Sequence, residues 1–255
     1  MRGVKLKMQA NVVSALLPVC MNLKEVAGAL NINALKLVPT AVAAGRAVLL
    51  ESQKENGVAI VEMGAATTSV AIFMEGFLQY FGVINVGANH ITNDIAISLA
   101  VSTEVAEEIK MKYVTAELID NDKPMTMRFG DESISFTKTM VNRIVEDRLI
   151  DIFEHVKKEI AIAGYEKKLP EGVVLTGGGA EMRGIERFAR EHMEVATRIG
   201  LPLMDVTHID NETKKPRFAV AIGLALMMND DMREQETRVE EKPVGFLSKL
   251  FGGGR

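Results

Sequence analysis

The chain has 255 residues, enough for one large domain or two modest ones. Hydrophobic residues make up 47% and charged residues 25%, the balance of an ordinary globular protein, and a net charge of −4 argues against a nucleic-acid binder. The single cysteine, Cys20, excludes an intrachain disulfide framework and a cysteine-based zinc site. The apolar run at 12–17 is too short for a signal peptide, and no run approaches the ~20 apolar residues of a transmembrane helix.

The first 56 residues alternate between strand-like and helix-like segments. The apolar patterns predict a strand over 8–14, a helix over 19–30, a short strand over 35–38 and a helix over 41–51 that stops in the polar stretch 52–57. Strand, helix, strand, helix is the order of an α/β fold.

Residues 57–73 predict a β-hairpin with a tight, polar turn. The apolar runs 58–63 and 70–73 are the strands of a buried sheet. Between them, small residues let backbone N–H groups approach an anion, and threonine hydroxyls add donors. The candidate anion-binding residues of this turn are Gly64, Ala65, Ala66, Thr67 and Thr68. The alternative is a plain hairpin with a cramped turn.

Residues 78–164 predict a mixed segment of strands and helices. We expect strands over 78–86, 116–119 and 125–129, and helices over 89–99, 102–111 and 139–163. His90, in the first turn of one helix, is more simply a capping or solvated residue than a metal ligand. Glu146 and Arg148, in IVEDR, are most simply part of a solvated helical face.

A second glycine-rich turn follows in GVVLTGGGAEMRGI, residues 172–185. The strand 173–176 is predicted to run into Gly177, Gly178 and Gly179, and a helix to begin at Glu181 and end at Glu191. Three glycines let the main chain lie flat against a ligand, and a following helix start favours anions. A generic strand-to-helix turn is the alternative.

The C-terminal region predicts an apolar helix over 218–227, a charged flexible linker over 230–243 and an amphipathic tail over 244–255. In a helical tail, Phe246, Leu247, Leu250 and Phe251 share an arc of ~140°, and Lys249 lies on the other side. Such a tail predicts weak, reversible binding to a membrane surface. A disordered end, or a helix packed on the body, is the alternative.

Several of these segments resemble one protein family. The 62–69 turn resembles the second phosphate loop of actin-like ATPases, DxGGGTTD, with Glu62, Ala65, Ala66 and Ser69 in place of Asp, Gly, Gly and Asp. VGANHITNDIA resembles VGGDHITNDIA of the FtsA family of bacterial division proteins, IVEDR resembles its IIEAR, and RIGLP, FAVAIGLALM and the amphipathic tail fit the same family. No Asp precedes Asp94, so a first phosphate loop is absent from residues 1–60.

The resemblance implies an actin-like (ribonuclease H-like) α/β domain with a smaller inserted α+β lobe and an incomplete N-terminal domain. It implies that 1–32 is the remnant of an inserted self-association subdomain and 33–56 the return segment of the first domain. The nucleotide-binding core would then comprise 57–95 and 170–229, and the inserted lobe 96–169.

The resemblance also implies a function. A member of this family tethers FtsZ filaments to the inner membrane face as a peripheral protein on the cytoplasmic side, self-associates and contacts other divisome proteins. ATP with Mg would bind on both turns, with Gly177, Gly178 and Gly179 at the adenosine, Glu146 on the nucleotide side and Glu62 at the metal. Because Glu62, Ala65, Ala66 and Ser69 change the motif, we expect little or no hydrolysis. A weak ATPase and a PilM-like pilus-assembly scaffold are the alternatives.

Overall fold

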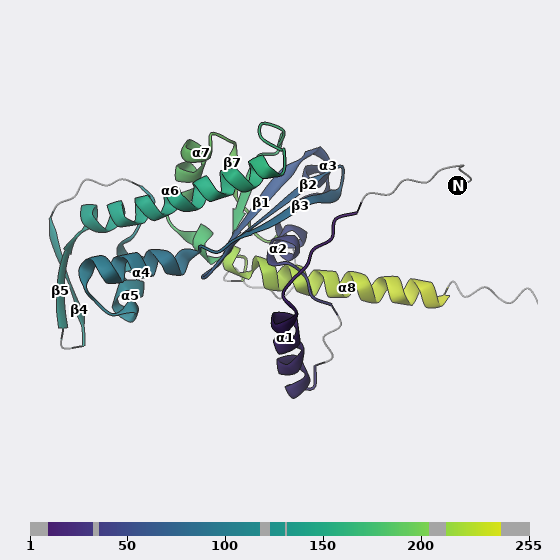
Figure 1. The fold of residues 1–255 in the computed structure, drawn as a ribbon, viewed down its shortest axis with the longest axis horizontal. Coiled ribbons are helices and arrows are strands. Elements are labelled where there is room, and N and C mark those ends of the chain that lie inside the picture. The colour runs from purple at the N-terminus through teal and green to yellow at the C-terminus, as the bar shows by residue number, and fades with distance from the viewer. Residues whose placement is uncertain (1–9, 33–35, 118–122, 131, 204–212, 241–255) are drawn as a thin grey trace, which may run out of the picture.

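A five-stranded mixed sheet forms the centre of the computed structural model (Figure 1), which describes residues 10–32, 36–117, 123–130, 132–203 and 213–240. Its strand order is β3-β2-β1-β6-β7. β1, β2 and β3 form an antiparallel meander, and β6 and β7 join β1 in parallel. The strands are β1 (Val58–Met63), β2 (Thr68–Met74), β3 (Phe77–Ile84), β6 (Val173–Thr176) and β7 (Thr197–Ile199).

Helices cover both faces of this sheet, which explains why its central strand is apolar at every position except Glu62. Every residue of β1 is buried. Val58 and Ile60 pack into a core with α2 (Thr40–Val48) and α8 (Ala219–Glu240). Ala59, Val61 and Met63 pack into a second, larger core that contains α6 (Lys138–Ile162) and α7 (Ile185–Met193).

The contact between α2 and α8 depends on small residues. A Cβ atom at Gly223 would lie 1.8 Å from the carbonyl oxygen of Ala43, so the two helix backbones touch at this glycine. At the periphery of the contact, Arg46 Nε donates to Asp230 Oδ2 at 2.9 Å. The sequence therefore places glycine where the two helices cross and a charged pair at the edge.

A smaller lobe extends from one end of the sheet (Figure 1). It contains α4 (Ala88–Leu99), α5 (Thr103–Tyr113), the N-terminal part of α6, and the two-stranded sheet of β4 (Pro124–Phe129) and β5 (Glu132–Thr137). The Ser102 hydroxyl caps α5 by accepting from the N–H of Val105, and the Thr137 hydroxyl caps α6 by accepting from Met140. Gly164, at φ +75°, lies directly beyond the end of α6.

The N-terminal expectations are partly wrong. Helix α1 (Leu17–Ala29) forms where a helix was predicted, but it stands apart from the body in Figure 1 and buries none of its residues. No strand forms over 10–14 or 36–38, the described parts of the two predicted strands. The predicted helix 41–51 ends at Val48, and a new helix, α3 (Glu51–Asn56), begins after Leu50.

Three further expectations differ from the structure. After Gly177 comes a short 3₁₀ turn, η1 (Gly178–Glu181), and α7 begins only at Ile185, since Gly184 adopts φ +83°. Ala116 and Glu117 do not form a strand, and 118–119 lie outside the described residues; β4 pairs instead with the unpredicted β5. Helix α8 continues to Glu240, so 230–240 is not the flexible linker expected; its glutamates and arginines suit a helix.

The tail, with Phe246, Leu247, Lys249, Leu250 and Phe251, lies outside the described residues. No helix in the described ranges is both long and apolar enough to cross a membrane.

Candidate functional site

The first turn of the candidate site joins β1 to β2. Gly64 N–H donates to the Thr67 carbonyl at 2.9 Å and closes the turn. Ala65 and Ala66 are exposed, and neither has a positive φ, so alanine is tolerated here without backbone strain. Among the described residues, the N–H groups of Ala65, Ala66 and Thr67 have no backbone acceptor. These three amides can bind an anion.

The second turn lies beside the first because β6 pairs in parallel with β1, with Thr176 opposite Glu62. Gly177 has φ +86°, and a Cβ atom there would lie 2.6 Å from the carbonyl oxygen of Met63. A Cβ at Gly179 would lie 2.8 Å from Met63 Cβ, whereas a Cβ at Gly178 would meet no atom within 4 Å. Gly177 and Gly179 are thus required by packing against β1, and Gly178 is not.

The two turns line one cavity of about 540 Å³. Gly64 and Ala65 form one side of it and Gly178 and Gly179 another, while α5, Lys138 and the segment 181–183 supply much of the rest. The lining carries five cationic side chains and two carboxylates: Lys110, Lys112, Lys138, Arg183, Arg217, Glu107 and Glu181. The cavity is large enough for a small organic ligand and its excess of positive charge favours an anion.

Two ion pairs order this lining. Lys110 Nζ lies 2.6 Å from Glu107 Oε2 and donates to Thr92 Oγ1 at 2.8 Å, and the lysine side chain is only 9% exposed. Burial acts to raise the pKa of Glu107, but hydrogen bonds from Lys110 and Thr92 hold this pKa below its ordinary value. In the second pair, Arg217 Nε donates to Glu181 Oε1 at 2.7 Å, and this hydrogen bond lowers the pKa of Glu181.

Glu62 lies beneath both turns. Its carboxyl Oε1 would be 2.8 Å from a Cβ at Gly177, and the residue is 7% exposed. Burial raises the pKa of Glu62, an effect that the Thr40 hydroxyl partly offsets. No group of three or more His, Cys, Asp or Glu forms a metal cluster within the described ranges. Mg²⁺ usually takes one or two carboxylates with water and phosphate oxygens, so Glu62 could supply one ligand.

Two predicted ligand residues occupy other positions. Thr68 is fully buried and its hydroxyl donates to the Val86 carbonyl at 2.8 Å, because strand pairing turns the side chain into the core. Thr68 therefore holds the turn rather than facing a ligand. Glu146, on α6, is not among the residues that line the cavity. Ala66, Thr67 and Gly177 belong to the two turns but do not line the cavity.

The contributions of α5 and of the segment after η1 to the cavity were not predicted from the sequence. Glu107 and Lys110 are three residues apart in EEIK, the spacing that puts two side chains on one helical face. That spacing alone could have indicated the pair. Nothing local indicates that Arg183 and Arg217 lie on the same cavity as the first turn.

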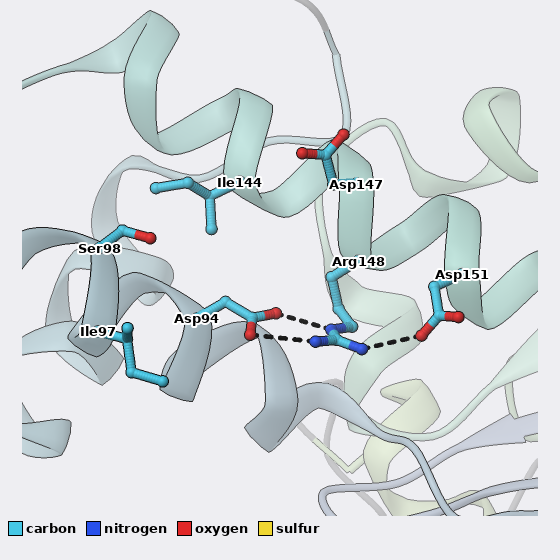
Figure 2. Close-up of a pocket in the computed structure, with 7 residues that line it drawn as sticks. All are labelled: Asp94, Ile97, Ser98, Ile144, Asp147, Arg148 and Asp151. Carbon is cyan, nitrogen blue, oxygen red and sulfur yellow. Dashed lines mark hydrogen bonds and ion pairs between the residues drawn. The ribbon is translucent and has the colours of Figure 1, made fainter.

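A second depression, of about 370 Å³, lies between α4 and α6 on the lobe (Figure 2). At its centre the Arg148 guanidinium donates to Asp94 at 2.7 and 3.1 Å and to Asp151 at 2.8 Å. The hydrogen bond to Asp94, with a smaller contribution from Asp151, raises the pKa of the Arg148 guanidinium, although partial burial acts to lower it. Ile97 is 79% exposed at the edge, so this α4–α6 groove offers both apolar and charged groups.

Comparison with known proteins identifies the family. The sequence model for "Cell division protein FtsA" matches residues 59–223. The chain belongs to the FtsA family. It is 30% identical to FtsA of Pseudomonas aeruginosa over 230 residues, which cover 89% of this chain and 55% of that protein. It is 30% identical to FtsA of Neisseria meningitidis over 262 residues, which cover the whole chain and 61% of the relative. The chain thus spans little more than half the length of these FtsA relatives.

Solved structures confirm the actin-like α/β fold, with partial coverage as expected for an incomplete domain. The chain superposes on MreB5 of Spiroplasma citri bound to ADP with a TM-score of 0.69 and 18% identity, covering 87% of this chain and 68% of that one. It superposes on a PilM–PilN type IV pilus biogenesis complex with a TM-score of 0.63 and 20% identity, covering 82% and 57%. These identities support the fold alone.

Proposed function

We propose that this FtsA-family chain is a nucleotide-binding adaptor that tethers FtsZ filaments to the cytoplasmic face of the cell membrane. The observation that carries nucleotide binding is that both turns line the same cationic cavity. The exposed amide of Ala65, a residue that lines the cavity, suits a phosphate oxygen, and the open space at Gly178 admits a ligand close to the main chain. The structural neighbour MreB5 was crystallised with ADP and with AMPPNP, which favours the same ligand class.

Little or no hydrolysis accompanies this binding. Hydrolysis needs a water or Mg²⁺ held at a fixed position by charged groups. Glu62 is buried with a raised pKa, and Ser69, where the ATPase motif has a second Asp, offers only a hydroxyl, whose Oγ lies 3.1 Å from Thr40 Oγ1. Phosphate release with Mg-ATP tests this: the adaptor releases none above background, and turnover abolished by Glu62→Ala would support a weak ATPase instead.

The α4–α6 groove is the surface that we assign to FtsZ. It combines the exposed Ile97 with the Asp94–Arg148–Asp151 ion-pair network, a mixture that suits a short peptide with aliphatic and charged residues (Figure 2). Ile97→Ser should abolish pull-down by the FtsZ C-terminal peptide. Ile162→Ser is the matched control, because Ile162 is 71% exposed near the C-terminal end of α6 and outside the groove. Equal retention of both variants would reject this surface. Failure of the FtsZ peptide to retain the wild-type chain would favour a pilus-type scaffold with another partner.

The amphipathic tail supplies the membrane contact. Full burial of its four large apolar side chains would contribute roughly 6–12 kcal/mol, but interfacial burial is partial, so one tail binds weakly. Self-association would multiply the tails on one assembly and strengthen binding. Anionic liposomes should co-sediment the whole chain but not a chain lacking 244–255. Phe251→Ser should weaken binding, and Phe77→Ser, which alters a side chain that is 72% exposed on β3, should not.

A further inference from the structure

The first turn of helix α4 holds the carbonyl side of the 64–67 turn. Ala88 N–H donates to the Gly64 carbonyl at 2.9 Å, and Asn89 N–H donates to the Ala65 carbonyl at 2.8 Å. A Cβ at Gly87 would lie 2.6 Å from the Ala65 carbonyl oxygen, so glycine is needed there for the turn to approach. Two of the amides that a helix N-terminus normally leaves unpaired are therefore used by the turn.

The geometry of the peptide unit decides where the turn's own donors point. In a planar trans peptide the C=O and N–H bonds point in opposite directions, and the described chain contains no cis peptide. The Gly64 carbonyl and the Ala65 N–H belong to one peptide unit, and the Ala65 carbonyl and the Ala66 N–H belong to the next. Since α4 binds both carbonyls, the N–H groups of Ala65 and Ala66 point away from α4, on the exposed side of the turn.

We propose that α4 acts on a bound phosphate through these two peptide units rather than by direct contact. Each helix N–H polarises the carbonyl that it binds, and hydrogen bonds in such a chain strengthen one another. The positive end of the α4 dipole is thereby transmitted to the Ala65 and Ala66 amides. We call the two peptide units between Gly64 and Ala66, with the Ala88 and Asn89 N–H groups that bind them, the peptide relay. Ala88 is a positioning residue in it, and its role rests on the proposed nucleotide binding.

Lys110, on α5, stabilises the first turn of α4, which donates to the relay. Its Nζ donates to the Ala88 carbonyl at 3.3 Å and to Thr92 at 2.8 Å, so α5 holds the first turn of α4 in place. Thr68 supports it from the strand side through its bond to the Val86 carbonyl at 2.8 Å. The relay therefore has fixed geometry before any ligand binds, which is the condition for effective electrostatic stabilisation.

An amide-to-ester substitution tests the relay without changing a side chain. Replacing Ala88 by L-lactic acid in the full chain substitutes an ester oxygen for its N–H and weakens the Gly87 carbonyl as an acceptor, while the side chain is kept. The same replacement at Ala96, in the third turn of α4, is the control for the general effect of an ester in this helix. In the ligand-free protein we expect the Ala65 amide proton resonance to move upfield in the Ala88 ester and to stay in place in the control. Tripolyphosphate should bind the Ala88 ester about 3–10-fold more weakly than the control, and adenosine equally well.

The outcomes separate the two proposals. An unshifted Ala65 resonance, or an equal loss of tripolyphosphate affinity in both esters, overturns the relay while leaving nucleotide binding intact. A wild-type chain that binds neither ATP nor tripolyphosphate contradicts the proposed nucleotide binding, and the ligand-free Ala65 resonance then decides whether α4 polarises the turn.

Discussion

Single methyl groups on the second turn separate the requirements of the fold from those of the ligand. Gly178→Ala places a Cβ where no atom lies within 4 Å, at a residue without positive φ. Gly179→Ala places a Cβ 2.8 Å from Met63 Cβ, a separation at which the turn or β1 must shift. The two variants add the same atom to neighbouring residues of the same cavity.

The two variants should change the free energy of unfolding in opposite directions. Overpacking at Gly179 lowers the free energy of unfolding by about 1–3 kcal/mol. The reduced conformational entropy of the unfolded chain raises it by about 0.4–1 kcal/mol. The net loss of about 1–2 kcal/mol lowers Tm by about 3–6 °C for a chain of this size. Gly178→Ala has only the favourable part, so its Tm should equal or exceed that of the wild type by about 1–3 °C.

Thermal unfolding by circular dichroism without nucleotide, followed by calorimetric titration with ATP, measures both effects. Gly178→Ala should fold normally and bind ATP at least tenfold more weakly, because its methyl group occupies ligand space. If Gly178→Ala binds ATP as the wild type does, the ligand does not approach this turn. If it loses as much stability as Gly179→Ala, the packing argument is wrong.

The remaining predictions concern packing and pH. Gly223→Ala should lower the free energy of unfolding by about 3 kcal/mol and Tm by about 6–12 °C, because its Cβ would lie 1.8 Å from the Ala43 carbonyl oxygen. Gly28→Ala, where the added Cβ meets no atom within 4 Å, is the control and should change Tm little. Equal Tm values for the two variants would contradict the α2–α8 contact. Glu62→Gln should raise Tm, and more so at pH 8 than at pH 5. Burial raises the pKa of Glu62, so the wild type loses stability as pH rises through that pKa, whereas glutamine does not ionise. A difference in Tm that does not change with pH would refute this. Burial and the 2.5 Å hydrogen bond to Glu159 raise the pKa of Tyr80 to about 12. The difference between the ultraviolet titrations of the wild type and Tyr80→Phe should therefore show this phenol ionising near pH 12. Ionisation near pH 10 would contradict the hydrogen bond.

Local sequence patterns correctly predicted the helices and strands whose own periodicity defines them. The apolar run of β1, the long stripe of α6 and the glycine-terminated β6 form where expected, because each is defined by its own periodicity. The break between α2 and α3 was not predictable from that pattern. Leu49 is 3% exposed and Leu50 is 54% exposed, and only the packing of α2 against the sheet distinguishes these two adjacent leucines.

The site was predictable only as far as its backbone. The two turns were found from their small residues, but the roles of individual side chains depend on distant partners. Thr68 looked like a phosphate donor, yet its acceptor, the Val86 carbonyl, is 18 residues away, and pairing of β2 decides the matter. Likewise β5 forms by pairing with β4 rather than by a strong pattern of its own. Long-range contacts of this kind are not encoded in a local motif.

Hydrogen–deuterium exchange with and without Mg-ATP tests the central claim, that both turns bind one phosphorylated ligand. We expect saturating ATP to slow exchange in peptides covering 63–69 and 176–183 together, with the same apparent Kd for both. Protection of only one turn, or ATP binding that protects neither, would contradict a shared site.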